Sequence, residues 1–170
     1  ESHAELQDQI EIEMDAFKPE SIYKRLNTAE EVLGAWPVET TWQGDRAFYQ
    51  TREDRITMPA KKLFQTTEGM YSTWAHEQVH STGHESRLNR DMGPETLVYA
   101  REELVAELGA FLICNKLQIC SDELNHAAYL KHWIEVLQQR PDALRLALSD
   151  ASKAAGLICK DLDQQVEVNM

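Results

Sequence analysis

The spacing of apolar and polar positions along the chain predicts an α+β domain. Between residues 36 and 58, turn signals separate three short segments that we expect to be strands, at residues 36–42, 46–49 and 55–58. Helical spacing predicts helices at residues 5–17, 28–33, 70–79, 99–114, 124–139 and 141–160, with a short helical turn at 60–64. Thr28 and Glu31 match a capping box at the start of the second of these helices, and Gly34 predicts its end.

The composition indicates one globular domain. The chain has 170 residues, of which 42% are hydrophobic and 27% charged, and this length is sufficient for one core. We expect an acidic helix or extension at residues 1–27, the folded domain at residues 28–165 and a loose tail at residues 166–170.

The charge and the cysteine count narrow the class of protein. With 17 basic and 29 acidic residues, the formal net charge of -12 argues against a phosphate-binding surface on this part of the protein. No run is apolar enough to span a bilayer and no secretory signal opens the chain, so we expect a cytoplasmic protein; a leader removed before Glu1 stays an open alternative. The odd number of cysteines, Cys114, Cys120 and Cys159, indicates reduced thiols.

An H-E-x-x-H match supplies the candidate chemistry. It is formed by His76, Glu77 and His80 within the segment WAHEQVHSTGH. Two histidines four residues apart lie on the same face of a helix and can present two imidazole nitrogens to one metal. Glu77 follows the first histidine, where its carboxylate can reach a metal-bound water. The alternative is two solvated surface histidines, but residues 70–79 contain no helix breaker and Gly83 predicts the helix end just after the match.

A catalytic zinc site needs a third protein ligand. The helix predicted at residues 99–114 is apolar on every side from Leu104 onward, yet it contains Glu107 in this run and Glu103 one turn earlier. Carboxylates on a buried face need a cationic partner or a metal. We assign Glu103 as the third ligand and Glu107 as the carboxylate that orients a ligand histidine through its free ring N–H. The reverse assignment stays open, as does a structural role in which an arginine neutralises both carboxylates: Arg87, Arg90 or Arg101.

Several other polar residues are candidates for the site. Tyr99 lies one turn before Glu103, so its hydroxyl can stabilise a developing oxyanion; the alternative is a core tyrosine. His84 is expected in a loop near the site, because Gly83 ends the helix first. His126 could hydrogen-bond a substrate or serve in packing.

Four segments carry a resemblance to a known family. The E-x-x-A-E run from Glu103 to Glu107 is similar to the gluzincin pattern, in which the first acid binds zinc and the second supports a histidine. From about residue 29 to 162, the chain resembles the C-terminal metallopeptidase-like domain of ArdC-type antirestriction proteins, also found in plasmid and phage proteins. The matching segments are GDRAFYQTREDRITMP, YSTWAHEQVHSTGHESRLNRD, YAREELVAELGAFLIC and HAAYLKHWIEVLQQRPDAL. The chain departs from the family pattern at Gln78 and Val79, which are not ligand positions.

The resemblance implies a zincin-like fold, with a small sheet on the active-site helix, and metal-assisted hydrolysis of a peptide or protein substrate. His76, His80 and Glu103 would hold zinc, with manganese or another divalent ion also accommodated, and Glu77 would act as the base. Single-stranded DNA binding would belong to an N-terminal domain that this sequence does not contain. The alternative is a non-catalytic, metal-stabilised interaction module supporting antirestriction or single-stranded DNA handling.

Overall fold

The computed structural model describes residues 19–119 and 141–162. The described elements are, in chain order, α2 (Pro19–Gly34), β1 (Glu39–Trp42), β2 (Phe48–Gln50), β3 (Arg55–Met58), the 3-10 turn η1 (Lys61–Leu63), α3 (Thr67–Thr82), α4 (Thr96–Lys116) and α6 (Pro141–Ile158). This mixture confirms the predicted α+β class. Over the same residues, no helix has the length and apolar character needed to cross a membrane.

The sheet has three strands in the order β1-β3-β2. β1 pairs with β3 in parallel, with Glu39 opposite Arg55, and β2 pairs with β3 antiparallel, with Phe48 opposite Thr57. β3 is therefore the central strand, and its last three residues are buried. β2 is an edge strand, and its position matters because it contacts α3.

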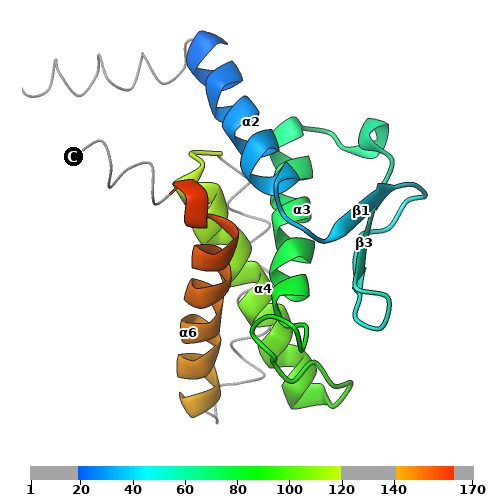
Figure 1. Cartoon of the computed structure of the whole chain (residues 1–170), viewed down its shortest axis with the longest axis vertical. Helices are drawn as coiled ribbons and strands as arrows, with labels where there is room; N and C mark the ends of the chain where they lie inside the picture. The colour runs from blue at the N-terminus through cyan, green and yellow to red at the C-terminus, as the bar shows by residue number, and fades with distance from the viewer. Residues whose placement is uncertain (1–18, 120–140, 163–170) are drawn as a thin grey trace, which may run out of the picture.

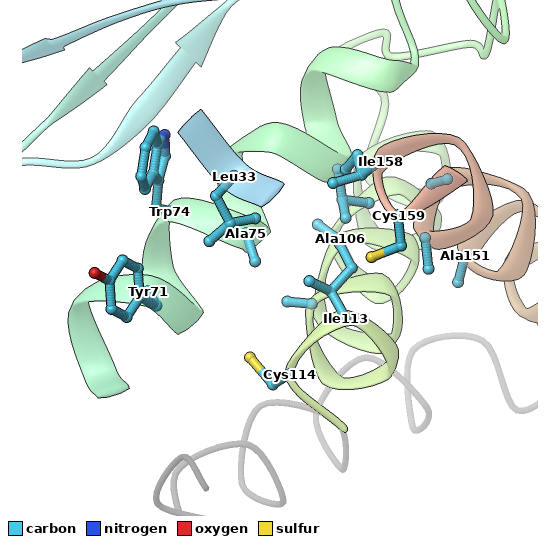
Figure 2. Packing of buried hydrophobic residues seen from close by; sticks show 14 of the residues in the cluster. Leu33, Tyr71, Trp74, Ala75, Ala106, Ile113, Cys114, Ala151, Ile158 and Cys159 are labelled. Atoms are coloured by element: carbon cyan, nitrogen blue, oxygen red, sulfur yellow. The ribbon is translucent and has the colours of Figure 1, made fainter. Parts of the chain in front are cut away.

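The helices form layers beside the sheet. α3 lies between the sheet and α4, and α6 packs along α4 on the side away from the sheet (Figure 1). The core between these helices contains many small side chains, including Ala75, Ala106 and Ala151, together with Ile113 and Ile158 (Figure 2). Small residues allow helices to approach closely, so the relative positions of α3, α4 and α6 are tightly determined.

Gly109 lies at a close contact between α4 and α3. A Cβ atom at this position would lie 2.8 Å from both Cγ atoms of Val79, which is fully buried. Because Val79 precedes His80, the glycine at position 109 allows α4 to lie directly against the part of α3 that carries the histidines.

Several predicted boundaries were wrong. Thr28 does not start a helix, because α2 begins at Pro19 and no proline or glycine interrupts it before Gly34. Residues 36–38 are not part of β1, since the pairing with β3 begins at Glu39. Trp36 contacts α3 instead, because its indole donates a hydrogen bond to Ser81 Oγ (2.8 Å). β2 lies at residues 48–50 rather than 46–49 for the same reason, because its ladder begins at Phe48.

Other predictions agree with the structure or lie outside it. The segments at 55–58, 60–64 and 70–79 correspond to β3, η1 and α3, and Pro141 begins α6 as expected. α4 is not buried throughout, because Phe111 and Leu112 are exposed. The helices predicted at residues 5–17 and 124–139, with His126 and Cys120, lie outside the described residues. The domain limits at residues 27 and 165 remain a prediction, although α2 crosses the first of them.

Candidate metal centre

The predicted ligands come together where α3 and α4 cross. His76 and His80 lie one turn apart on α3, and Glu103 faces them from α4. The two Nε2 atoms are 3.1 Å apart, and the Glu103 carboxylate lies 3.7 Å from Nε2 of His80 and 3.9 Å from Nε2 of His76. Among the described residues, this is the group whose potential ligand atoms all lie within 4.8 Å of one another.

These distances fit a small divalent ion. A tetrahedral ion with ligand bonds of about 2.1 Å places its ligand atoms about 3.4 Å apart. The three observed separations lie on both sides of that value. Two imidazole nitrogens and a carboxylate are also donors that such an ion accepts. The assignment of Glu103 rather than Glu107 stays a prediction, but the geometry places Glu103 on the side where the two Nε2 atoms meet.

Glu107 lies on the other side of His76. Its Oε1 is 3.5 Å from His76 Nδ1, and its side chain is largely buried. This is the place expected for a carboxylate that orients a ligand histidine through the ring nitrogen facing away from the metal. In the structural alternative, an arginine neutralises these carboxylates. Two of the three candidate arginines have other partners, because Arg87 forms an ion pair with Asp54 and Arg90 forms one with Glu102.

Glu77 is buried at the edge of the same group. Its side chain lines a cleft with His76 and His80, and only 6% of the residue is exposed. Burial, opposed by the nearby His80 and reinforced by the charge of Glu103, raises the pKa of Glu77 to about 7. The carboxylate also accepts a hydrogen bond from the backbone N–H of Tyr49 in β2. The edge strand thus positions the side chain predicted to act as a base.

Glu102 is a member of the site that the sequence analysis missed. Its Oε1 lies 3.2 Å from Nδ1 of His80, and its two oxygens accept hydrogen bonds from Arg90 at 2.9 and 2.6 Å. Burial opposes ionisation, yet the hydrogen bonds from Arg90 and His80 lower the pKa of Glu102 below its ordinary value. One signal could have revealed it: positions 102, 106, 109 and 113 have helical spacing, and the last three carry only small or apolar residues.

Tyr99 is not a core residue. The residue lines the cleft and is 49% exposed. Burial of part of the ring, together with the charge of Glu103 and a hydrogen bond to it, raises the pKa of the Tyr99 hydroxyl. The hydroxyl therefore remains protonated at neutral pH and lies beside a predicted ligand.

The cleft is open to solvent and lies between three elements. It has a volume of about 420 Å³, and residues 47–49 of the β2 region line one side while α3 and the start of α4 line the others. Phe48 and Tyr99 contribute exposed aromatic surface to it. A second hollow, which includes His84 and Arg52, adjoins it through Thr51 and Met92.

A polar cluster fixes the β2–β3 hairpin to the end of α3. The Tyr49 hydroxyl donates to Asp54 (2.7 Å), and the Arg87 guanidinium donates to both oxygens of Asp54. Arg87 Nε also donates to the backbone carbonyl of Ser81 (2.8 Å). This cluster, which we call the hairpin anchor, fixes the strand whose Tyr49 N–H binds Glu77.

The remaining candidates lie away from the metal group. His84 lies in the loop after α3, as expected, and interacts with Ser86. Cys114 and Cys159 are buried free thiols in the core, and neither belongs to the group of potential ligands. Of the two unusual positions in the motif, Val79 packs against Gly109 and Gln78 donates to the Leu33 carbonyl at the end of α2 (2.7 Å). Val79 and Gln78 therefore connect α3 to α4 and α2, respectively.

The fold and this site define a zincin-like protein. A model of the family described as zincin-like metallopeptidase matches residues 27–150, and the chain belongs to this family. Curated relatives include two Escherichia coli proteins named DNA primase TraC. One is 37% identical over 155 residues, covering 88% of this chain and 11% of that protein; the other is 31% identical over 187 residues, covering 94% and 17%. The chain therefore spans less than a fifth of the length of these relatives.

Two solved structures of the antirestriction protein ArdC from plasmid R388 are similar to this chain. The Mn(II)-bound structure matches with a TM-score of 0.65 and 35% identity, over 81% of this chain and 51% of that chain. The metal-free structure matches with a TM-score of 0.64 and 34% identity, over 86% and 52%. The predicted resemblance to ArdC-type antirestriction proteins and the zincin-like fold are thereby confirmed.

Proposed function

We propose that this chain is the metal-dependent hydrolase domain of a longer antirestriction protein and that it cleaves peptide bonds. One observation carries the proposal: the ligand atoms of His76, His80 and Glu103 converge in an open cleft beside the carboxylate of Glu77. A structural metal site is normally closed by a fourth protein ligand and has no need of a base beside it.

The three predicted ligands would hold a divalent ion. Nitrogen and carboxylate donors fit zinc best and also accept manganese, and the Mn(II)-bound ArdC relative supports an ion of this kind. When bound, the ion would supply Lewis acidity, polarising a carbonyl and acidifying a water molecule.

Glu77 is the proposed general base. A base is most effective when its pKa lies near the working pH, and burial raises the pKa of Glu77 to about 7. Its carboxylate would accept the proton of the attacking water and return a proton to the leaving amine. The N–H of Tyr49 holds the carboxylate in orientation.

Tyr99 and β2 would act on the substrate. Tyr99 is half-exposed, and its protonated hydroxyl would exchange its hydrogen bond with Glu103 for one to the oxyanion that develops at the cleaved carbonyl. β2 pairs with β3 along one edge and lines the cleft, so an extended peptide could lie along it. We therefore favour a peptide or protein substrate, and we assign single-stranded DNA binding to another domain of the longer protein. A cytoplasmic location is part of the same proposal.

The decisive experiment replaces Glu77 with Gln. The amide is nearly isosteric with the carboxylate, so Glu77→Gln should retain zinc or manganese while hydrolysis of an unfolded protein such as casein falls by about 10²–10⁴-fold. Glu68→Gln is the matched control, because it removes a carboxylate at the far end of the same helix and should leave the rate unchanged.

Two outcomes would contradict the proposal. If the purified protein binds neither zinc nor manganese after reconstitution, the metal centre does not exist. If the full-length protein carrying Glu77→Gln still blocks restriction completely, the chemistry is dispensable for that function and the domain is an interaction module.

A further inference from the structure

Arg90 and Glu102 form a buried ion pair next to the metal centre. Their side chains are 3% and 5% exposed, respectively. Arg90 Nε donates to Oε2 of Glu102 at 2.9 Å and Nη2 to Oε1 at 2.6 Å, which is the two-point geometry preferred between guanidinium and carboxylate. Arg90 also donates to the Val79 carbonyl (2.9 Å) and to Thr82 Oγ1 (2.7 Å), so the guanidinium is fixed to the last turn of α3.

The carboxylate of this pair reaches a predicted metal ligand. Oε1 of Glu102 lies 3.2 Å from His80 Nδ1. An ionised carboxylate is only an acceptor, so in the neutral imidazole, the form that binds a metal, this contact places the proton on Nδ1 and leaves a lone pair on Nε2. Nε2 is the atom that faces His76 (3.1 Å) and Glu103 (3.7 Å).

We infer that Arg90 and Glu102 are positioning residues that set the tautomer and the ring orientation of His80 for metal binding. Arg90 fixes the carboxylate, and the carboxylate fixes the imidazole. Their role differs from that of Glu103, which faces the metal group, and from that of Glu107, which lies beside His76. The role rests on the metal site of the proposed function and does not depend on hydrolysis.

A role in stability alone does not account for this arrangement. Replacing a buried ion pair by apolar residues of similar size is often neutral or stabilising, so such a pair is weak evidence for a role in stability. Here the pair ends on a ring nitrogen whose partner atom points into the metal group. A test must therefore measure metal binding and fold stability separately.

The double variant Arg90→Met with Glu102→Leu makes this separation. It removes both charges together, so neither is left buried without a partner. Without metal, we expect the double variant to have a melting temperature close to that of the wild-type protein. Its dissociation constant for Zn²⁺, measured by competition with a chelator, should rise about 10–100-fold. The control is Asp142→Leu with Arg145→Met, which removes an exposed ion pair on α6. Its zinc affinity should change by less than about twofold.

Glu102→Asp provides a second test if the double variant does not fold. It keeps the charge beside Arg90 but withdraws the oxygen from His80, so zinc should again bind more weakly, and the visible absorption spectrum of the Co²⁺-loaded protein should change.

Unchanged zinc affinity and an unchanged cobalt spectrum in the folded variants would overturn the positioning role while leaving the hydrolase proposal intact. Absence of metal binding by the original protein would instead overturn the metal centre itself. Weaker zinc binding together with a Glu77→Gln variant that remains fully active would support the positioning role and contradict the proposed base.

Discussion

Each histidine of the centre has a carboxylate beside Nδ1, the ring nitrogen directed away from the ligand group. Glu107 lies beside Nδ1 of His76, and Glu102 beside Nδ1 of His80. Glu103 is the carboxylate that lies near the Nε2 atoms of both rings. Three glutamates within six positions of one helix are therefore expected to have separable effects on metal binding.

Substitution of these glutamates tests the ligand assignment. Glu103→Ala should abolish binding of zinc or manganese, because a three-ligand site loses one of its ligands. Glu107→Gln should still bind the metal, but with an affinity about 10–100-fold lower, as for other residues that orient a ligand histidine. Isothermal titration calorimetry of the two variants measures both effects. The opposite order, with the larger loss in Glu107→Gln, would make Glu107 the ligand.

Asp54 in the hairpin anchor should make the stability of the protein depend on pH in the acidic range. The hydrogen bonds from Arg87, opposed by burial and supported by Tyr49, lower the pKa of Asp54 below its ordinary value of 3.8. A native pKa below the unfolded one means that the stabilisation is present above pH 3.8 and disappears as the pH falls through the native pKa. Asp54→Asn should therefore lower the free energy of unfolding by about 1–2 kcal/mol at pH 7 and by progressively less below pH ~4.

Urea unfolding of both proteins across this pH range measures the difference. Asp142→Asn is the control, because Asp142 pairs with Arg145 on the exposed side of α6 and should give no measurable change. An equal loss of stability at pH 3 and pH 7 in Asp54→Asn would contradict the role of the charge.

The sequence predicted the residues of the H-E-x-x-H motif but not all their neighbours, and the reason is physical. His76, Glu77 and His80 lie within one helical turn, so the helical period alone places them together. Arg90 and Glu102 meet only because the loop after α3 folds back onto that helix, with Asn89 in the left-handed region at φ 47°. Contacts that depend on a loop path have no periodic signature in the chain.

At the scale of elements, the approach of α3 to α4 determines the separation of the predicted metal ligands. Gly109 permits this approach, since any larger residue would meet Val79. Gly109→Ala adds helix propensity worth up to about 1 kcal/mol. Overpacking at a fully buried contact costs about 1–3 kcal/mol, so the net effect should be destabilising.

Thermal unfolding and zinc titration test this prediction together. Gly109→Ala should lower the melting temperature and weaken zinc binding, because Glu103 would move away from the two histidines. Gly156→Ala in α6 is the matched control: a Cβ atom added at this glycine would have no neighbour within 4 Å, so the change should be neutral or slightly stabilising. The second substitution Val79→Ala should restore zinc affinity to Gly109→Ala, and failure of this rescue would count against the helix separation as the cause.

Element types were easier to predict than element limits. The turn signals around the strands and the uninterrupted helical runs identified β3, α3 and α6, with Pro141 at the start of α6. Thr28 was misread because a capping box is a local pattern, whereas a helix continues wherever nothing breaks it. The order β1-β3-β2 has no local signal, because the same turns would also permit a simple meander.

At the scale of the whole molecule, the core and the metal centre are adjacent but separate. Val79, Leu104 and Ile113 are almost fully buried in the interior between the helices, whereas the side chains of the predicted ligands line the cleft. A metal bound by His76, His80 and Glu103 would therefore join α3 to α4 at one edge of an interface that apolar packing already holds together. The net charge of -12 also favours accumulation of cations around the molecule.

Removal of the metal should consequently weaken the fold without abolishing it. An ion present at 100 times its dissociation constant stabilises the native state by about 2.7 kcal/mol, which corresponds to a rise of about 5–10 °C in melting temperature for a domain of this size. After dialysis against EDTA, the protein should keep its helical circular dichroism and unfold cooperatively at the lower temperature; zinc should restore the difference. His80→Ala should show the lower temperature in both conditions, since a ligand is missing. Loss of helical signal in the EDTA-treated protein would mean that the metal, rather than the packing of α3, α4 and α6, holds the domain together.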